Sequence, residues 1–396
     1  MNKKLEYQDE LEDFSLVLGG PLYQLYLRTR LAKPPLKLYQ RRILAFIILT
    51  WLPLLILTMI DGTAVSGIKV PFFYDFASHA RFLVALTLLI AAELVVHQRI
   101  RFTMVQFVDR DIITLEERPL FDSIIASNMR LKNSIIVELS LIVIAIIAGH
   151  WIWKEFATLS VSTWYATISD GIPHITPAGY WGAFVSVPIF QFILLRWYFR
   201  IFVWYRILWQ VSRLPLRLNS LHPDKAGGLG FLAYSAFAFG LVLLAHSVLL
   251  AGVIANRIWY EGANLKEFKL AIAGVIVYLI LLVFVPLTFF FFQLARAKRI
   301  GSREFGIIAS HYVNDFRSKW TGADLKRNET LLGTSDIQSL ADLSNSFTVG
   351  HEMRLLPFNL RTVVQIVIVI FFPFIPLLLT IIPFEEMIGP ILKIIL

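Results

Sequence analysis

Residues 268–294 read FKLAIAGVIVYLILLVFVPLTFFFFQL, a continuous apolar run in which Lys269 is the only charged side chain. A helix that crosses the hydrocarbon core of a bilayer needs about 20 predominantly apolar residues. This run is longer than that, and it ends at the basic segment that begins with Arg296. The stretch therefore predicts a transmembrane α-helix.

Six further apolar stretches alternate with polar connections along the chain. The composition agrees, since 57% of the residues are hydrophobic and only 16% are charged, with a mean hydropathy of +0.67. Soluble domains carry about 25% charged residues. The sequence predicts an all-α, polytopic membrane protein with seven transmembrane helices and cytoplasmic helical extensions. The predicted spans are 43–60, 82–97, 135–153, 180–199, 229–255, 268–294 and 362–382.

The distribution of Lys and Arg predicts the orientation. Four connections, 1–42, 97–133, 196–228 and 294–361, hold all but seven of the 37 basic residues. Short loops rich in Lys and Arg stay in the cytoplasm. We therefore expect the N-terminus to be cytoplasmic and the C-terminus to lie outside. The seven basic residues on the predicted outer side are Lys69, Arg81, Lys154, Arg257, Lys266, Lys269 and Lys393.

The same reasoning divides the chain into four regions. We expect a cytoplasmic N-terminal segment (1–42), six spans with cytoplasmic helical extensions (43–294), a cytoplasmic helical loop (295–361), and a seventh span with an outer interfacial tail (362–396). Within the third region, Thr334 or Ser335 is suited to cap an amphipathic helix.

Charge and cysteine content restrict the partners. The chain has no cysteine, which excludes disulfides, thiolate catalysis and iron–sulfur clusters. Its net charge of +9 is concentrated in the predicted cytoplasmic segments. This pattern favours contact with membrane lipids, including anionic headgroups on the cytoplasmic side. No nucleic-acid motif is present, and we expect no metal, no cofactor and no nucleic-acid partner.

Ionisable side chains inside the predicted spans are candidate functional residues. At 1.5 Å per residue, Glu93 and Glu138 each lie about 9 Å from the cytoplasmic end of their spans. A charged group at mid-membrane costs about 2.5 to 3.5 kcal/mol on insertion scales, so each carboxylate should find a partner. The layer is either a proton or cation relay or a set of structural ion pairs. Its candidate members are Glu93, His97, Glu138, Arg196 and Arg200.

The sequence LHPDKAGGLGFL, residues 221–232, precedes the fifth span. An acidic cap, two adjacent glycines and a lysine beside free N–H groups are the components of an anion site at a helix N-terminus. The alternative is a tight turn that re-enters the membrane. The motif lacks the Walker A spacing, so nucleotide binding is not expected. Its candidate residues for an anion or lipid headgroup are His222, Asp224, Lys225, Gly227 and Gly228.

This segment, together with LADLSNSFTVGHEMRLLPF and the terminal PLLLTIIPFEE, resembles an uncharacterised family of bacterial multi-pass membrane proteins. The resemblance implies residence in a bacterial inner membrane. It implies no substrate and no catalytic residues.

Three functions remain open at this point. The polar layer favours an ion channel or transporter, which would then be expected to form a homo-oligomer. The alternative is a non-transporting scaffold or sensor that acts through its cytoplasmic helices, for which sealed ion pairs are expected. The third is a lipid-active enzyme, for which His222 and Asp224 are the compact candidates. Their spacing across a proline argues against a prearranged acid/base pair, so we expect no enzymatic activity.

Overall fold

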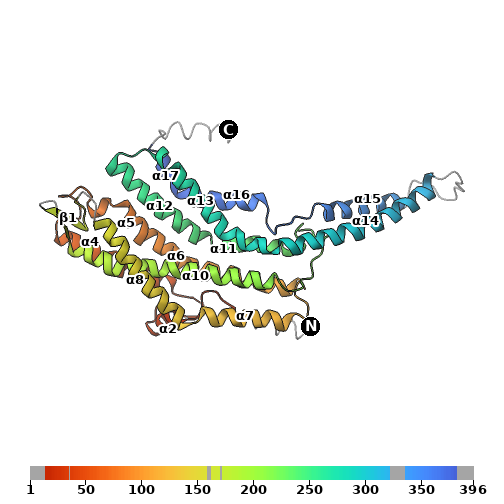
Figure 1. The fold of residues 1–396 in the computed structure, drawn as a ribbon, viewed down its shortest axis with the longest axis horizontal. Coiled ribbons are helices and arrows are strands. Elements are labelled where there is room, and N and C mark those ends of the chain that lie inside the picture. The colour runs from red at the N-terminus through yellow and green to blue at the C-terminus, as the bar shows by residue number, and fades with distance from the viewer. Residues whose placement is uncertain (1–13, 35, 158–161, 170–171, 322–334, 381–396) are drawn as a thin grey trace.

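A computed structural model describes residues 14–34, 36–157, 162–169, 172–321 and 335–380. The chain forms a bundle of long helices from which a helical arm projects (Figure 1). Within these described ranges, six helices are long and apolar enough to cross a membrane, and these properties indicate an integral membrane protein. They are Tyr39–Ile60, Phe76–Asp109, Pro177–Val211, Leu229–Glu261, Leu265–Thr321 and Leu360–Leu378.

The third predicted span lies in helix α8 (Ile135–Ala157). The described side chains of α8 extend as far as Ile147, and Ile135–Ile147 is a shorter apolar helix than the other six. Six spanning helices are thus supported by length and composition. The seventh span and the orientation of the termini stay predictions.

Each of the six helices named above is composed of several segments. They are numbered here in the order just given, without α8, so that the first is Tyr39–Ile60 and the last is Leu360–Leu378. The first contains α3 (Tyr39–Thr50) and α4 (Leu52–Ile60). The second contains α5 (Phe76–His79), the π-helical turn η2 (Ala80–Ala85) and α6 (Leu86–Asp109). The third contains α9 (Pro177–Trp181), the π-helical turn η3 (Gly182–Ser186) and α10 (Val187–Val211). The fourth contains η4 (Leu229–Leu232), α11 (Ala233–Ala238) and α12 (Gly240–Glu261). The fifth contains η5 (Leu265–Phe268), α13 (Lys269–Phe284), η6 (Val285–Phe290) and α14 (Phe291–Thr321). The last contains α16 (Leu360–Phe371), η7 (Phe372–Phe374) and α17 (Ile375–Leu378).

Prolines mark several of these changes of helix type. Pro53 lies at the start of α4, Pro286 lies in η6, and Pro373 lies in η7. Proline has no backbone N–H and its ring displaces the carbonyl of the preceding turn, so the regular hydrogen-bond ladder is interrupted there. Each of these spans is consequently divided into separate helical segments at its proline.

The remaining elements lie in the connections. They are α2 (Pro21–Arg28), η1 (Phe72–Tyr74), α7 (Arg118–Lys132), the strands β1 (Ala166–Ser169) and β2 (Ile172–Ile175), and α15 (Ser335–His351). The two strands pair antiparallel, with Ala166 opposite Ile175. The all-α prediction did not include this hairpin. Its sequence signal is the Asp170-Gly171 dipeptide between two short β-prone segments, which favours a two-residue hairpin turn.

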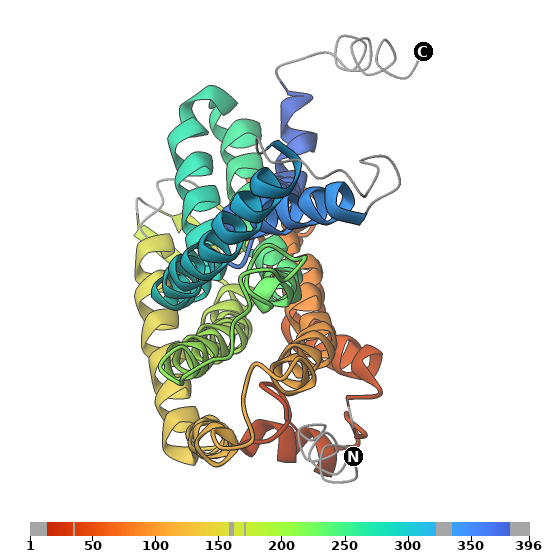
Figure 2. The ribbon, with the colours of Figure 1, turned by 90° about the vertical axis from the view of Figure 1, so that its right-hand side faces the viewer.

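Helix α10 lies inside the bundle, between α8 on one side and α6 on the other (Figure 2). Its Trp197 and Trp204 are almost fully buried. The Trp197 indole donates a hydrogen bond to the carbonyl of Leu89 on α6, at 3.1 Å. This contact satisfies the one polar group of a large apolar side chain, and it fixes the relative height of α6 and α10.

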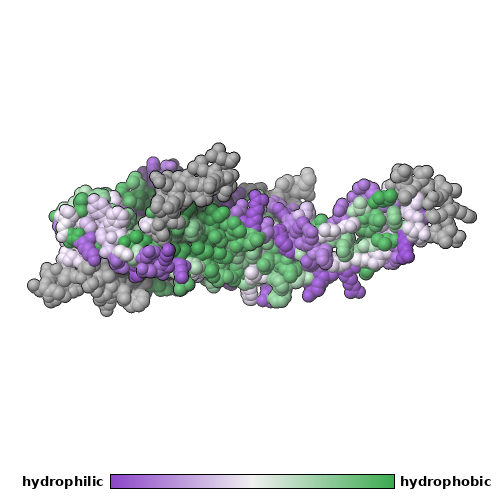
Figure 3. Space-filling model, turned by 90° about the horizontal axis from the view of Figure 1, so that it is seen from above, coloured by the Kyte–Doolittle hydropathy of each residue, from purple (hydrophilic) through white to green (hydrophobic). Residues whose placement is uncertain are grey.

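The arm consists of the far part of α14 and of α15, which pack side by side (Figure 1). Asp336 joins them, because its carboxylate accepts hydrogen bonds from Lys319 at 2.8 Å and from the Trp320 indole at 3.0 Å. In the space-filling view, apolar side chains dominate part of the bundle, whereas polar side chains gather toward the base of the arm (Figure 3). The prediction of helices that extend beyond the apolar spans is confirmed for α10 and α14.

Candidate functional site

Glu93 on α6 joins three helices. One carboxylate oxygen accepts a hydrogen bond from the guanidinium of Arg42 on α3. The other accepts one from Nη2 of Arg200 on α10, at 2.9 Å. All three side chains are buried, with exposed fractions of 5% for Glu93, 0% for Arg42 and 4% for Arg200. Both oxygens of this carboxylate are therefore occupied by arginine inside the bundle.

Arg42 was missed as a member of this site. In the sequence, Arg42 stands at the end of the polar N-terminal segment, as a charge that flanks the predicted first span. The structure begins α3 at Tyr39, so Arg42 is helical and its side chain lies against Glu93 and the ring of Tyr26. The sequence did contain a signal that Arg42 belongs to the helix. Arg42, Phe46 and Thr50 are spaced four residues apart, so in a helix they share one face.

Glu138 on α8 makes a second, separate set of contacts. Its Oε1 lies 3.4 Å from Nε of Arg196 on α10. Its two oxygens also accept from the backbone N–H of Leu22, at 3.2 and 3.3 Å. Leu22 lies in the first turn of α2, where unpaired N–H groups favour a negative charge. Glu138 thus pairs with Arg196 and caps α2 at the same time.

His97 lies one helical turn from Glu93 on α6, as predicted, but it contacts a different group. Its Nδ1 is 2.8 Å from Oγ of Ser15. The same hydroxyl oxygen accepts from the N–H groups of Val17 and Leu18. His97 is 4% exposed, so it supports the fold of the segment that precedes α2. The structure brings Glu93 to Arg200 and Glu138 to Arg196, whereas His97 contacts Ser15.

Lys132, at the end of α7, is a further cation of this region. Its ammonium group donates to the backbone carbonyls of Ser15, at 2.7 Å, and of Leu18. Burial, together with the positive charges of Arg200 and Arg196, lowers the pKa of Lys132 to about 7. We refer to these six ionisable residues as the charge layer: Arg42, Glu93, Lys132, Glu138, Arg196 and Arg200.

A pocket opens at one side of the charge layer. It lies between the segment that precedes α2, helix α8 and helix α10, and its empty volume is about 330 Å³, including space open to solvent. Lys132, Glu138, Arg196 and Arg200 supply its polar lining. Because part of this volume is open solvent, the enclosed space is small, and the pocket is a shallow recess lined by charged groups.

The loop of residues 221–232, here called the HPDK loop, is organised around Asp224. Its carboxylate accepts hydrogen bonds from the backbone N–H groups of Ala226 at 2.8 Å, Gly228 at 3.1 Å and Gly230 at 2.8 Å. Nδ1 of His222 lies 2.9 Å from the same carboxylate. Burial alone would raise the pKa of Asp224, but these hydrogen bonds and His222 together lower it. The N–H groups that were predicted to bind an external anion therefore bind Asp224.

Two glycines give the HPDK loop its shape. Gly227 and Gly228 have φ of +65° and +97°, values that L-residues with a side chain rarely adopt. A Cβ on Gly227 would also lie 2.9 Å from the methyl group of Met353. That methyl group is the end of a flexible side chain and can move aside, so the positive φ is the stronger reason for glycine at this position.

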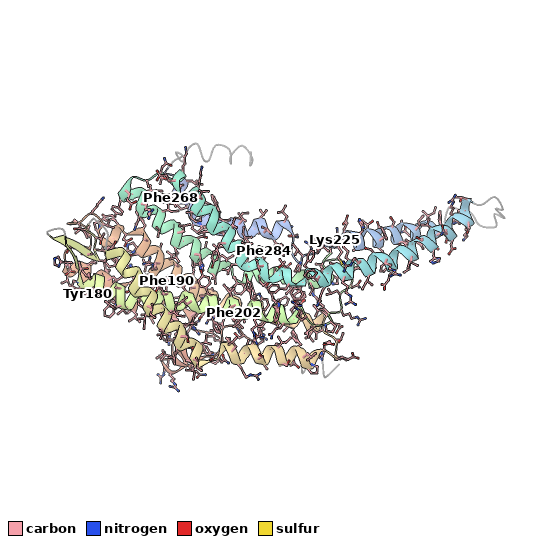
Figure 4. All side chains as sticks on the ribbon, in the orientation of Figure 1. Tyr180, Phe190, Phe202, Lys225, Phe268 and Phe284 are labelled. Atoms are coloured by element: carbon pink, nitrogen blue, oxygen red, sulfur yellow. The ribbon has the colours of Figure 1, made fainter. Side chains whose placement is uncertain are left out.

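The HPDK loop fastens the arm to the bundle. Lys225 forms an ion pair with Glu352, and the guanidinium of Arg354 donates to the carbonyl of Asp224 at 2.7 Å. On the bundle side, Arg110 at the end of α6 donates to the carbonyl of Gly228 at 3.3 Å. Figure 4 shows Lys225 where the bundle meets α14 and α15. The loop is a structural junction between the spanning helices and the arm.

In the ranges that the structure describes, no three His, Cys, Asp or Glu side chains are grouped so as to hold a metal ion. The fold and the charge layer define a multi-pass helical membrane protein with a buried ion-pair network. No family model, no curated protein and no solved structure matches the chain. The interpretation of the site therefore depends on its own geometry.

Proposed function

We propose that this protein is a membrane-embedded scaffold that presents its helical arm to a partner protein in the cytoplasm. The proposal depends on one contrast within the structure. Both carboxylates of the charge layer are held in ion pairs, whereas the arm exposes apolar side chains. The proposal assigns no catalysis to the chain. It includes seven spans, a cytoplasmic N-terminus and residence in a bacterial inner membrane.

The closed ion pairs support a structural role for the charge layer. A carboxylate that carries ions or protons across a membrane must be reached by water and must exchange its partner. Glu93 is 5% exposed and is held by two arginines from two other helices. Buried charge pairs of this kind are costly to separate. The arrangement supports helices held in fixed register, as a scaffold requires.

The arm has the surface chemistry of a docking element. Ile307, Ile308 and Val313 on α14 are 51%, 51% and 47% exposed, and Ile337 on α15 is 46% exposed. Exposed apolar groups surrounded by charge are typical of protein contact sites. Basic residues outnumber acidic ones along α14, so we propose a partner that combines apolar and acidic side chains. The basic residues of α14 are Arg296, Lys298, Arg299, Arg303, Arg317 and Lys319.

Site-specific photo-crosslinking in cells tests the scaffold proposal. A photoreactive phenylalanine analogue in place of Val313 is expected to give one defined adduct with a protein that has an acidic surface. Ile307→Glu together with Ile308→Glu should reduce the adduct to background, because a carboxylate forced into an apolar contact loses its hydration. Mass spectrometry of the adduct identifies the partner.

The matched control is Leu115→Glu, which adds one carboxylate at an exposed apolar position outside the arm. This variant should crosslink like the wild type. Adducts with lipid alone, or an adduct that survives both arm substitutions, would count against the proposal.

The pocket beside Glu138 favours a second candidate function, an ion channel or transporter. Flux through proteoliposomes distinguishes the two functions. Under the scaffold proposal, the wild type and the Glu93→Gln, Glu138→Gln double variant should both be silent across pH and voltage. A wild-type current that the double variant loses, while it keeps its fold and oligomer size, would establish transport through the charge layer.

A further inference from the structure

The pocket beside the charge layer combines cationic and apolar side chains, an arrangement for which the scaffold proposal has no role. Three of its lining side chains, Lys132, Arg196 and Arg200, are cationic. Leu141 and Phe199 contribute apolar surface. The α8 residues that continue from Leu141 are exposed, including Val143 at 54% and Ile144 at 48%. The proposed function takes α8 as a spanning helix, and on that basis these exposed apolar residues would face lipid and the pocket would open beside acyl chains.

Positive charge exceeds negative charge in the charge layer. Its four cations face only two carboxylates, and one of these, Glu93, is shared by Arg42 and Arg200. Arg196 has Glu138 as its ion-pair partner, and Lys132 donates to two neutral carbonyls. Excess buried charge of one sign is unfavourable unless a counter-charge is present. Among the described residues, the pocket lining holds three cations and one carboxylate, Glu138, which pairs with Arg196, so positive charge remains in excess beside the pocket.

We propose that this pocket binds the phosphate group of an anionic phospholipid from the adjoining leaflet. Arginine presents a planar fork of N–H donors that matches phosphate oxygens, and lysine supplies a compact positive charge. Arg196 and Lys132 would supply these two kinds of contact from α10 and α7. The phosphate would lie at the open side of this shallow recess, within reach of the two cations, while the acyl chains would lie along α8.

The titration of Lys132 gives the proposal a pH dependence. The charged groups that face Lys132 are Arg196 and Arg200 on α10 and Glu138 on α8, with His97 on α6 nearby. The pKa of Lys132 is about 7, so its ammonium form predominates at pH 6 and its neutral form at pH 8. Phosphate binding should accordingly be tighter at pH 6 than at pH 8.

Thermal unfolding of the purified full-length protein, followed by tryptophan fluorescence, tests the proposal. The probes are short-chain phosphatidylglycerol, phosphatidylcholine of the same chain length, and inorganic phosphate. Each is titrated into detergent-solubilised protein. Phosphatidylglycerol should raise the Tm and phosphatidylcholine should not. Lys132→Gln should weaken the phosphatidylglycerol effect about tenfold, as expected for the loss of one charge-assisted contact.

Two further variants make the test specific. Arg130→Gln removes the same charge from an exposed position on α7 and should bind like the wild type. Leu141→Trp fills the pocket without a change of charge and should abolish the effect.

Equal stabilisation by inorganic phosphate would support an anion site in this pocket whose ligand is free phosphate. Equal shifts with both lipids, or folded Lys132→Gln and Leu141→Trp proteins with wild-type affinity, would overturn the proposal. This test does not involve the arm, so its failure is separable from failure of the scaffold function.

Discussion

Replacing Glu93 with glutamine is expected to lower the free energy of unfolding by about 3–5 kcal/mol, the usual effect of removing one partner from a buried charge pair. The substitution keeps the size of the side chain and removes its charge. Arg42 and Arg200, which are 0% and 4% exposed, would then remain buried without a carboxylate. This is the largest effect that we expect of any single substitution in the charge layer.

Arg42 makes the effect severe. Its Nε and Nη2 atoms already have no hydrogen-bond acceptor among the described residues, so Glu93 supplies its ionic hydrogen bond. A membrane interior offers little water to replace a lost partner. The change is therefore expected to loosen the contacts of α3 and α10 with α6, rather than to affect a single side chain.

Reversible unfolding in mixed micelles, monitored by tryptophan fluorescence, measures this loss. Glu116→Gln is the matched control, since Glu116 is exposed in the connection before α7. A triple variant, in which Arg42 and Arg200 become methionine and Glu93 becomes leucine, should recover most of the stability, because apolar packing often replaces a buried ion pair at no net cost. A stable Glu93→Gln protein would show that the arginines find other partners and that the ion pairs do not hold the bundle.

Replacing Asp224 with alanine is expected to release the HPDK loop and the arm that it fastens. Three backbone N–H groups would lose a charged acceptor, and hydrogen bonds to charged groups contribute about 1.5–3 kcal/mol each. Water reaches part of this loop and would replace some of them, so we expect a net loss of about 3 kcal/mol. The loss should be local to the loop and to the contacts of Arg354 and Glu352.

The contribution of Asp224 should depend on pH in a defined direction. The pKa of its carboxyl group is lowered in the folded protein, so the charged form stabilises the fold. The stabilisation is complete above the unfolded pKa of about 3.9. It is lost as the pH falls through the lower folded value. The wild-type loop should begin to lose stability below about pH 4 and open only at a lower pH, whereas the Asp224→Ala loop should be open throughout.

Amide hydrogen exchange at Ala226, Gly228 and Gly230 measures both effects directly. Faster exchange of these three amides in the Asp224→Ala protein at neutral pH is the expected result. Asp61→Ala, at an exposed aspartate outside the loop, should leave them unchanged. Wild-type protection in the Asp224→Ala protein would mean that the glycine conformations, and not the carboxylate, hold the loop.

The helices could be predicted from the sequence better than the contacts between them. Long apolar runs with charged flanks are local properties, and six helices in the described part of the chain satisfy them. The small hairpin was missed because its strands, at four residues each, are too short to give a clear periodic pattern. The predicted outer tail and Thr334 lie outside the described residues.

The sequence alone determined that apolar helices would bury a few ionisable residues, because a bilayer tolerates such charges only with partners. It identified Glu93, Glu138, Arg196 and Arg200, since each interrupts an apolar run. Only the tertiary structure decided the pairing. Arg42 and Lys132 lie beside charged flanks in the sequence, and they join the layer because α3 and the end of α7 pack against α6 and the segment before α2. The HPDK loop shows the same division, since its N–H groups were evident from the sequence, while the occupation of those groups by Asp224 depended on how the loop folds back on itself.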